Sequence, residues 1–185
     1  MDGEDGGAVS ESGISEANIN LAIALKLQNL LEQSGATVIL TRSTDEAIYD
    51  TNSDGSMREK KVSDLKNRVK IGNTSSADIF VSIHLNKIPQ EQYYGWQTFY
   101  KSNDEQSKLL AESIQNNLNN TIQKENHRLA KTIENIYIVD NVEIPLTIVE
   151  CGFLSNAQEL SDLQKEEYQE RLAWGIYNGI MNWFQ

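Results

Sequence analysis

Four polar residues occupy positions from which they could carry out hydrolytic chemistry. His84 and Asn86 end the apolar segment FVSIHLN, and Glu150 directly follows the apolar run LTIV. Glu16 lies in the first turn of a helical pattern, where a carboxylate interacts favourably with the helix dipole and can also point at a metal ion. One imidazole and two carboxylates at one edge of a sheet would resemble a zinc hydrolase site with one ligand absent.

Each of these residues also has an ordinary structural explanation. A glutamate such as Glu16 is usually only a partner of the helix dipole. A histidine that ends an apolar strand, as His84 does, is more often a hydrogen-bonded core residue than a metal ligand. Glu150 is harder to explain in this way, because a carboxylate after four apolar residues carries a desolvation cost. It must be paired, bound to a metal or act as a base with a raised pKa.

Three further candidates have weaker support. Cys151 could act as a nucleophile with His84, but a buried cysteine that behaves as a small apolar residue is favoured, since nothing nearby in the sequence would lower its pKa. His127 lies in the polar segment KENHRLAK and is predicted to face solvent. The aromatic residues of YYGW, at 93–96, could stack on a sugar, although aromatic side chains beside a strand more often serve packing.

Helical and strand patterns alternate along the chain and would position these residues. Apolar residues recur at helical spacing between Ser15, a predicted N-cap, and Gly35, which suits the end of a helix. Further helices are predicted around 65–71 and over 109–122 and 168–184. Strands are predicted at 37–42, 78–86, 95–101, 136–139 and 146–153, and a long surface loop at 43–62.

This alternation predicts a single α/β domain with a mostly parallel, mixed sheet covered by helices on both faces. A chain of 185 residues with 39% hydrophobic content can bury one sizeable core. In such sheets the working residues collect beyond the carboxyl ends of the strands. We therefore expect His84, Asn86 and Glu150 to lie at strand tips and to converge with Glu16.

Composition excludes several classes of protein. The formal net charge of −11 and the pI near 4.6 argue against a nucleic-acid-binding surface, which would need clustered Lys and Arg. One cysteine leaves no internal disulfide framework. The sequence has no apolar run of roughly 18 residues, so no transmembrane segment is predicted.

Taken together, the motifs resemble those of the zinc-dependent N-acetylmuramoyl-L-alanine amidases of the amidase-3 type. The resemblance covers nearly the whole chain, 1–185, and its most specific pieces are SIHLN and VECGFLSN. The segments QTFY and RLAKTIENIYIV look like the branch that prepares the spore cortex for germination by removing peptide stems from muramic acid. The resemblance thus implies a catalytic domain that cleaves the bond between N-acetylmuramic acid and L-alanine, exported to the cell wall or spore envelope.

The resemblance also implies roles for individual residues. In the family, zinc is held by a histidine from a glycine-rich loop after the first strand and by the residues that match Glu16 and His84. The glutamate that matches Glu150 serves as general base, and Asn86 would orient the substrate or a zinc ligand. Zinc would polarise the scissile carbonyl and lower the pKa of bound water toward about 7, while the base passes a proton to the leaving amine.

One departure from the family pattern concerns the start of the chain. The family's first strand ends in a segment of the form Asp-Pro-Gly-His-Gly-Gly, and aligning its continuation onto GEDGGAV puts Met1 about where the zinc-binding histidine belongs. We therefore expect the first strand and one zinc ligand to be missing, zinc to bind weakly or not at all, and activity to be low. His127 could substitute, although a solvent-facing histidine is favoured. A protein partner or a swapped dimer would compensate for the lost strand.

Two other functions remain open from the sequence. A non-catalytic relative could bind peptidoglycan or a partner protein through the same cleft. A zinc peptidase acting on ordinary peptide bonds is a further alternative, although the short motif His-Glu-x-x-His is absent from the sequence. Nucleotide binding is disfavoured, because no Gly-x-Gly-x-x-Gly segment follows any predicted strand.

Overall fold

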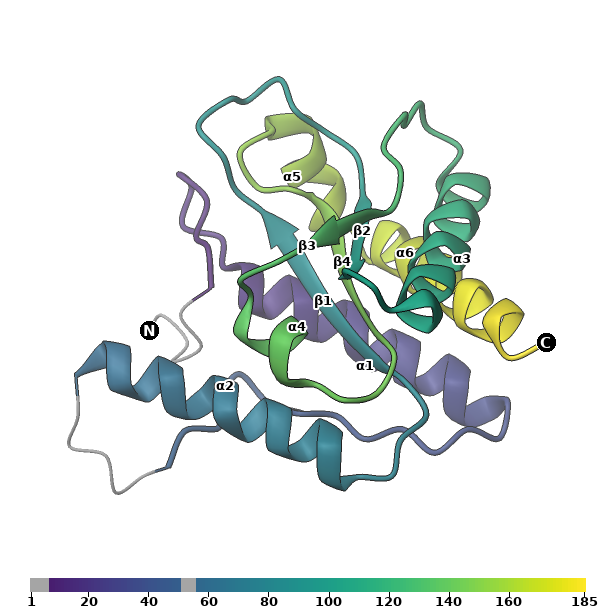
Figure 1. Cartoon of the computed structure of the whole chain (residues 1–185). Coiled ribbons are helices and arrows are strands. Elements are labelled where there is room, and N and C mark those ends of the chain that lie inside the picture. Colours follow the sequence, from purple (N-terminus) through teal and green to yellow (C-terminus); the bar gives the residue numbers. More distant parts are fainter. Residues whose placement is uncertain (1–6, 51–55) are drawn as a thin grey trace.

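The computed structural model describes residues 7–50 and 56–185, in which helices and strands alternate (Figure 1). The helices are α1 (Glu16–Gln33), α2 (Met57–Thr74), α3 (Glu105–Ile122), α4 (Tyr137–Asn141), α5 (Ala157–Leu163) and α6 (Glu166–Trp183). The strands are β1 (Phe80–Asn86), β2 (Gln97–Lys101), β3 (Lys131–Ile133) and β4 (Leu146–Phe153). The predicted single α/β domain is confirmed.

The four strands form one mixed sheet in the order β1-β4-β2-β3. β1 runs parallel to β4, and β2 runs parallel to β3, whereas β2 and β4 are antiparallel. β4 is therefore flanked on both sides, while β1 pairs with another described strand along one edge only. This arrangement matches the predicted mixed sheet.

Helices cover both faces of the sheet because successive side chains of β4 point to opposite sides. Val149 and Cys151 pack into the larger core, against apolar side chains of α1, α3 and α6. Leu146 and Ile148 pack into a smaller core with α4, against which part of α2 also packs. Figure 1 shows α3 and α6 side by side to the right of the sheet and α2 below it, to the left.

α1 forms where its end signals predict it. The Ser15 side chain accepts a hydrogen bond from the Ala17 amide at 3.2 Å, which caps the first turn. At the other end Gly35 has a φ of +89°, a left-handed conformation that glycine adopts without strain. The Ser15 cap makes Glu16 the first helical residue, and the Glu16 carboxylate accepts a hydrogen bond from the Leu85 amide of β1 at 3.2 Å.

Three sequence predictions about local structure are wrong. The segment 37–42 is not a strand in the structure, because no neighbouring strand among the described residues pairs with it. The segment 136–139 lies mainly in α4, and a short apolar run of this kind fits a buried helix as well as a strand. Part of the predicted loop 43–62 is helical, since α2 begins at Met57, and residues 51–55 of that loop lie outside the described residues.

The start of α2 has a signal that the prediction overlooked. The Ser56 amide donates a hydrogen bond to Glu59 Oε2 at 2.7 Å, so the carboxylate three residues into the helix satisfies a backbone group at its start. Ser followed by Glu three positions later is a sequence signature of a helix N-terminus. α2 is consequently longer than the helix predicted around 65–71.

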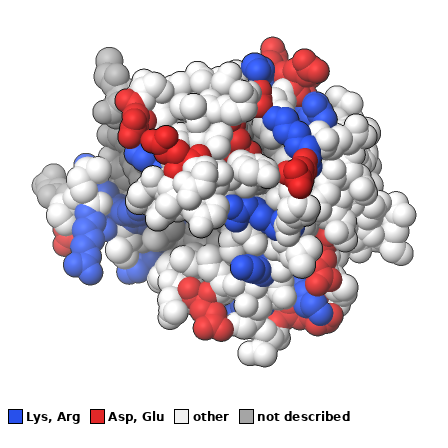
Figure 2. All heavy atoms as spheres, turned by 90° about the horizontal axis from the view of Figure 1, so that it is seen from above, with Lys and Arg blue, Asp and Glu red and all other residues white. Residues whose placement is uncertain are grey.

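The surface carries charges of both signs. On the face drawn in Figure 2, the blue Lys and Arg side chains of the described residues are interspersed with red Asp and Glu side chains. No helix within residues 7–50 and 56–185 is long and apolar enough to cross a membrane.

The close packing of α3 on α6 depends on small residues in α6. A Cβ atom added at Gly179 would lie 2.4 Å from Ile114 Cα, and one at Gly175 would lie 2.8 Å from Leu118 Cδ2. The backbone of α3 cannot move away from Gly179 without opening the larger core. Gly179 therefore sets how near the two helices approach.

We expect Gly179→Ala to lower the free energy of unfolding by about 1–3 kcal/mol, the usual cost of overpacking a core. Alanine favours a helix over glycine by up to about 1 kcal/mol, so a purely local effect would have the opposite sign. Asn178→Ala, on the same helix, is the matched control and should change stability by less than about 0.5 kcal/mol. Urea unfolding followed by circular dichroism measures both, and a Gly179→Ala protein as stable as the parent would contradict this account of the packing.

Candidate active site

Glu16, at the start of α1, and Glu150, on β4, both lie beside His84 on β1, although the three residues are far apart in the sequence. His84 Nδ1 lies 3.1 Å from Glu16 Oε1. The Cα atoms of His84 and Glu150 are direct partners in the parallel pairing of β1 with β4. The predicted convergence of the three residues is therefore present in the structure, while their chemical roles remain predictions.

The Glu16 carboxylate is held by several hydrogen bonds from the backbone and from its own helix. Its Oε2 accepts from the Ala8 amide at 2.8 Å, and its Oε1 accepts from Asn20 Nδ2 at 3.0 Å and from the Leu85 amide at 3.2 Å. The residue is only 8% exposed. A buried carboxylate with this many donors is fixed in position and stays ionised.

The pKa of Glu16 follows from these contacts. Burial by itself would raise the pKa, but the hydrogen bond with His84 and the one from the Ala8 amide outweigh it and lower the pKa to about 2. The same pairing acts on the imidazole. Its partial burial alone would lower the pKa of His84, whereas the hydrogen bond to Glu16 and the charge of Glu150 raise it. Glu16 and His84 thus form an ion pair whenever the imidazole is protonated.

His84 is held on both ring nitrogens and remains accessible. Its Nε2 lies 2.9 Å from Ser82 Oγ, two residues earlier on the same face of β1. The His84 side chain is 42% exposed. The imidazole therefore has a defined orientation and an open side toward solvent.

Glu150 differs from Glu16 in having few partners. Its Oε2 atom is buried and has no hydrogen-bond partner among the residues that the structure describes. Burial raises the pKa of Glu150 to about 7, the nearby His84 charge opposes this, and the charge of Glu16 adds to it. A carboxyl group with a pKa near neutrality can both accept and donate a proton at physiological pH.

The position of Glu150 corrects one detail of the prediction. Glu150 does not lie at a strand tip, because β4 continues to Phe153. It shares a face with Leu146 and Ile148, so it belongs to the side of the sheet that α2 and α4 cover. The site is built across the sheet face near the end of β1 and is not confined to the strand ends.

Asn86 ends β1 two residues after His84, as the sequence predicts. The pairing of β1 with β4 shifts register between these two residues. The Asn86 carbonyl accepts a hydrogen bond from the Leu154 amide at 2.8 Å, which ties the ends of the two strands together. Its role toward substrate stays a prediction.

The weaker candidates, Cys151, His127 and the aromatic residues at 93–96, lie outside the group formed by Glu16, His84 and Glu150. Cys151 is fully buried, and burial raises the pKa of its thiol far above the ordinary value, so it is a packing residue. The His127 side chain is 84% exposed and lies 2.9 Å from Glu125. Trp96 is buried, whereas Tyr93 and Tyr94 are exposed.

Sequence reasoning overlooked residues that position the site. Asn20, four residues after Glu16 on the same helix face, holds the carboxylate, and Ser82, two residues before His84, contacts the imidazole. Helical and strand periodicity from the predicted ligands would have found both. Gln97, the Cα partner of Glu150 on β2, accepts a hydrogen bond at 3.2 Å from Arg128. No short-range signal links Arg128 to Gln97, because only tertiary structure joins these segments.

The described residues include two neighbouring side chains of the kinds that bind zinc. Glu16 and His84 are chemically suitable ligands and contact each other, but no group of three His, Cys, Asp or Glu side chains in residues 7–50 and 56–185 is arranged to hold a metal. Catalytic zinc generally has three protein ligands and one open position. These residues alone therefore do not fit a complete catalytic zinc centre.

Comparisons with known proteins identify the family. The family described as N-acetylmuramoyl-L-alanine amidase matches residues 2–182. The germination-specific N-acetylmuramoyl-L-alanine amidase of Bacillus subtilis (strain 168) is 38% identical over 98% of this chain and 76% of the relative. The CwlD amidase from Clostridioides difficile, solved in complex with the GerS lipoprotein, superposes with a TM-score of 0.93 at 45% identity, over 96% of this chain and 91% of that chain.

A second solved structure extends the agreement to the fold as a whole. The N-acetylmuramoyl-L-alanine amidase from Clostridium difficile 630 gives a TM-score of 0.85 at 30% identity, over 99% of this chain and 91% of that chain. The family match and the structural superposition both cover nearly the whole chain, and the matched residues 2–182 include Glu16, His84 and Glu150. The chain therefore belongs to the N-acetylmuramoyl-L-alanine amidase family.

Proposed function

We propose that this chain, 1–185, is a catalytic domain that hydrolyses the amide bond between N-acetylmuramic acid and the L-alanine of the peptidoglycan stem, with the spore cortex as its substrate. The observation that carries the proposal is the meeting of a fixed carboxylate, an accessible imidazole and a second carboxyl group whose pKa is raised. The name of the B. subtilis relative, a germination-specific amidase, supports the assignment to the cortex.

Glu150 would act as general base and then as general acid. Its carboxylate removes a proton from the attacking water as the new carbon–oxygen bond forms at the lactyl carbonyl. The resulting carboxylic acid then donates that proton to the alanine nitrogen as the carbon–nitrogen bond breaks. A pKa of about 7 suits both steps, because neither protonation state is strongly disfavoured near neutral pH.

Glu16 and His84 would be the metal ligands that the described part of the chain contributes. The family is generally zinc-dependent, and zinc supplies carbonyl polarisation and a more acidic bound water. Asn20 and the Leu85 amide keep the Glu16 carboxylate aimed at His84. Asn86, at the end of the same strand as His84, would contact the substrate.

The proposal extends to location and partners. The solved C. difficile amidase is bound to a lipoprotein, which supports a protein partner for this chain. Dimerisation by exchange of a segment is the other way in which the chain could be stabilised. We further propose that the chain acts outside the cytoplasm, at the cell wall or spore envelope, where its peptidoglycan substrate lies.

A second function is favoured by one observation, the incomplete set of zinc ligands among the described residues. If no third ligand is supplied, the same cleft would bind peptidoglycan or a partner without cleaving it. The two functions differ in a direct product assay, because only an amidase releases free stem peptides and leaves the glycan intact.

We expect Glu150→Gln to reduce the release of stem peptides from purified peptidoglycan by about 10²–10⁴-fold, the usual contribution of general acid–base catalysis. Glutamine has nearly the same shape but cannot accept the proton. Mass spectrometry of the digest, at saturating zinc, measures the release. Glu112→Gln, an exposed carboxylate on α3, is the matched control and should keep the parent rate. No stem release by the unmodified chain would reject the catalytic proposal in favour of binding alone.

We expect zinc to bind much more weakly than at structural sites, whose apparent binding free energies are about 10–16 kcal/mol, because residues 7–50 and 56–185 offer two neighbouring ligands and not the usual three. Metal analysis after dialysis should show well under one zinc per chain. Glu16→Gln and His84→Ala should remove the weak binding seen by calorimetry, whereas the exposed His127→Ala should leave it unchanged. Tight stoichiometric zinc that survives dialysis would show that the ligand set is complete.

A further inference from the structure

The polar residues of the candidate site continue past Glu150 to the strand on its other side. The Cα atom of Glu150 pairs with that of His84 on β1 and with that of Gln97 on β2. Residues paired in this way turn their side chains to the same face of a sheet, so Gln97 shares a face with His84 and Glu150. Gln97 Oε1 accepts a hydrogen bond from Arg128 Nη1 at 3.2 Å. The row of polar residues therefore ends in a cation.

Arg128 is held in one orientation from several sides. Its Nε donates a hydrogen bond to the Tyr94 carbonyl at 2.9 Å. The centre of its guanidinium group lies 4.7 Å from the ring centre of Phe153 and 5.9 Å from that of Tyr93, distances at which a cation is attracted to an aromatic ring. Its partner Gln97 is itself buried. The guanidinium group is therefore oriented before any ligand binds.

The charge of Arg128 is not neutralised within residues 7–50 and 56–185. Both of its hydrogen-bond acceptors are uncharged, and no carboxylate of these residues forms an ion pair with it. Burial raises the pKa of Glu159 and the Arg128 charge opposes this rise, but the Glu159 oxygens accept from the amides of Gly95 and Phe153. Arg128 Nη2 donates to no described residue. An oriented guanidinium group of this kind suits a carboxylate ligand.

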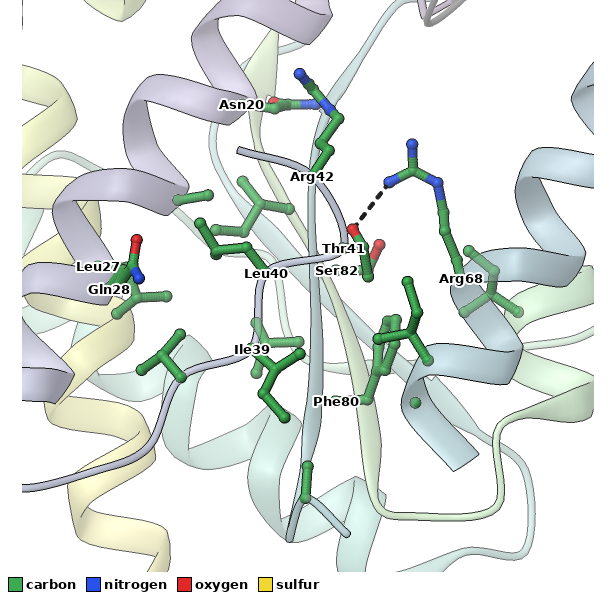
Figure 3. A pocket seen from close by; sticks show the side chains of 18 of the residues that line it. Asn20, Leu27, Gln28, Ile39, Leu40, Thr41, Arg42, Arg68, Phe80 and Ser82 are labelled. Carbon is green, nitrogen blue, oxygen red and sulfur yellow. Dashed lines mark hydrogen bonds between the residues drawn. The ribbon is translucent and has the colours of Figure 1, made fainter. Parts of the chain in front are cut away.

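The two other arginines beside the site already bind groups of the protein. Figure 3 shows Arg42 and Arg68 in the cavity that α1, α2 and β1 line. Arg68 pairs with Asp64 on its own helix, and its Nη1 lies 3.2 Å from Thr41 Oγ1, the dashed contact in Figure 3. Arg42 donates a hydrogen bond of 2.7 Å to a backbone carbonyl of α1. These two side chains therefore hold the fold around the site.

The position and charge of Arg128 match one half of a peptidoglycan substrate. The glycan is uncharged near the scissile bond, because its N-acetyl groups are neutral and its lactyl carboxyl is amidated, whereas the stem peptide carries carboxylates beyond its L-alanine. Neighbouring strands lie about 4.8 Å apart, so Arg128, beyond Gln97, is on the order of 10 Å from Glu150. An extended residue spans at most about 3.3–3.6 Å, which corresponds to two or three residues of the stem.

We propose that Arg128 binds a carboxylate of the stem peptide, at its second or third residue, so that the peptide arm of the substrate runs over β2. The proposal rests on the proposed function in one respect, that peptidoglycan is the substrate. Arg128 contacts the substrate away from the reacting atoms. It therefore selects negatively charged stems and sets the direction in which the scissile bond crosses Glu150.

The test compares three synthetic muramyl peptides as probes. The first is N-acetylmuramoyl-L-alanyl-D-glutamate with a free α-carboxylate and with its γ-carboxyl capped as a methylamide. The second has the α-carboxyl amidated as well and is uncharged. The third extends the amidated dipeptide through its γ-carboxyl with meso-diaminopimelate. Calorimetry measures binding to the full chain carrying Glu150→Gln, which prevents loss of the probe by cleavage.

We expect a carboxylate probe to bind about ten- to a hundredfold more tightly than the uncharged probe, the usual gain from charge-assisted hydrogen bonds. A gain with the first probe assigns the carboxylate to the second residue of the stem, and a gain with the third probe alone assigns it to the third. Arg128→Gln, added to the same chain, should remove the preference. Arg128→Lys should keep part of it, since lysine retains the charge without the planar fork.

A matched variant separates a direct contact from net charge. Lys108→Gln removes the same charge from α3, where Lys108 pairs with Glu105 at 3.4 Å, and should leave the preference unchanged. A residue that only supported its own loop would change the affinities for all three probes by the same factor. Circular dichroism and thermal unfolding check that each variant is folded.

Four results would overturn the proposal. They are equal affinity for all three probes, no binding of any probe, a preference that survives Arg128→Gln, and a preference lost equally in Lys108→Gln. Failure of the amidase proposal would look different, because binding is measured without cleavage. A chain that shows the Arg128-dependent preference but releases no stem peptides would reject the amidase activity alone, and a chain that cleaves without this preference would reject the present inference alone.

Discussion

The parallel pairing of β1 with β4 is the constraint on which the site depends. It sets the Cα atoms of His84 and Glu150 opposite each other, and the alternation of side chains along both strands turns the two groups to the same face. A shift of one residue in this register would turn one of them into the larger core, where Val149 and Cys151 now lie. The burial of Val149 and Cys151 therefore fixes the relative positions of the His84 and Glu150 side chains.

The two carboxyl groups of the site have different pKa values because their surroundings differ. Both Glu16 and Glu150 are largely removed from water, but backbone and side-chain N–H groups surround Glu16, whereas Oε2 of Glu150 has no partner among the described residues. Hydrogen bonds lower the pKa of Glu16 and keep it ionised, whereas burial without such bonds raises the pKa of Glu150 to about 7. One fold thus places a fixed carboxylate and a carboxyl group of raised pKa beside the same imidazole.

The extended segment 37–41 shows that strand formation depends on a neighbouring strand as well as on sequence. Residues 37–41 have strand propensity and run extended, yet they form no strand because no described strand pairs with them. β1, in contrast, pairs with β4 along one edge, and no described strand pairs with its other edge. The unpaired edge of a strand can bind another strand, and the edge strand β1 is also the strand that carries His84.

The sequence by itself determined the α/β class, the main helices and the core strands β1 and β4, and it predicted which residues would form the candidate site. Apolar periodicity and end signals such as Ser15 act over a few residues, and a carboxylate after LTIV signals its own desolvation. Only the tertiary structure decided that 136–139 is helical, that Glu150 lies within its strand, and that Arg128 contacts Gln97 beside Glu150. Those features depend on which distant segments meet, and local propensity carries no information about contacts between such segments.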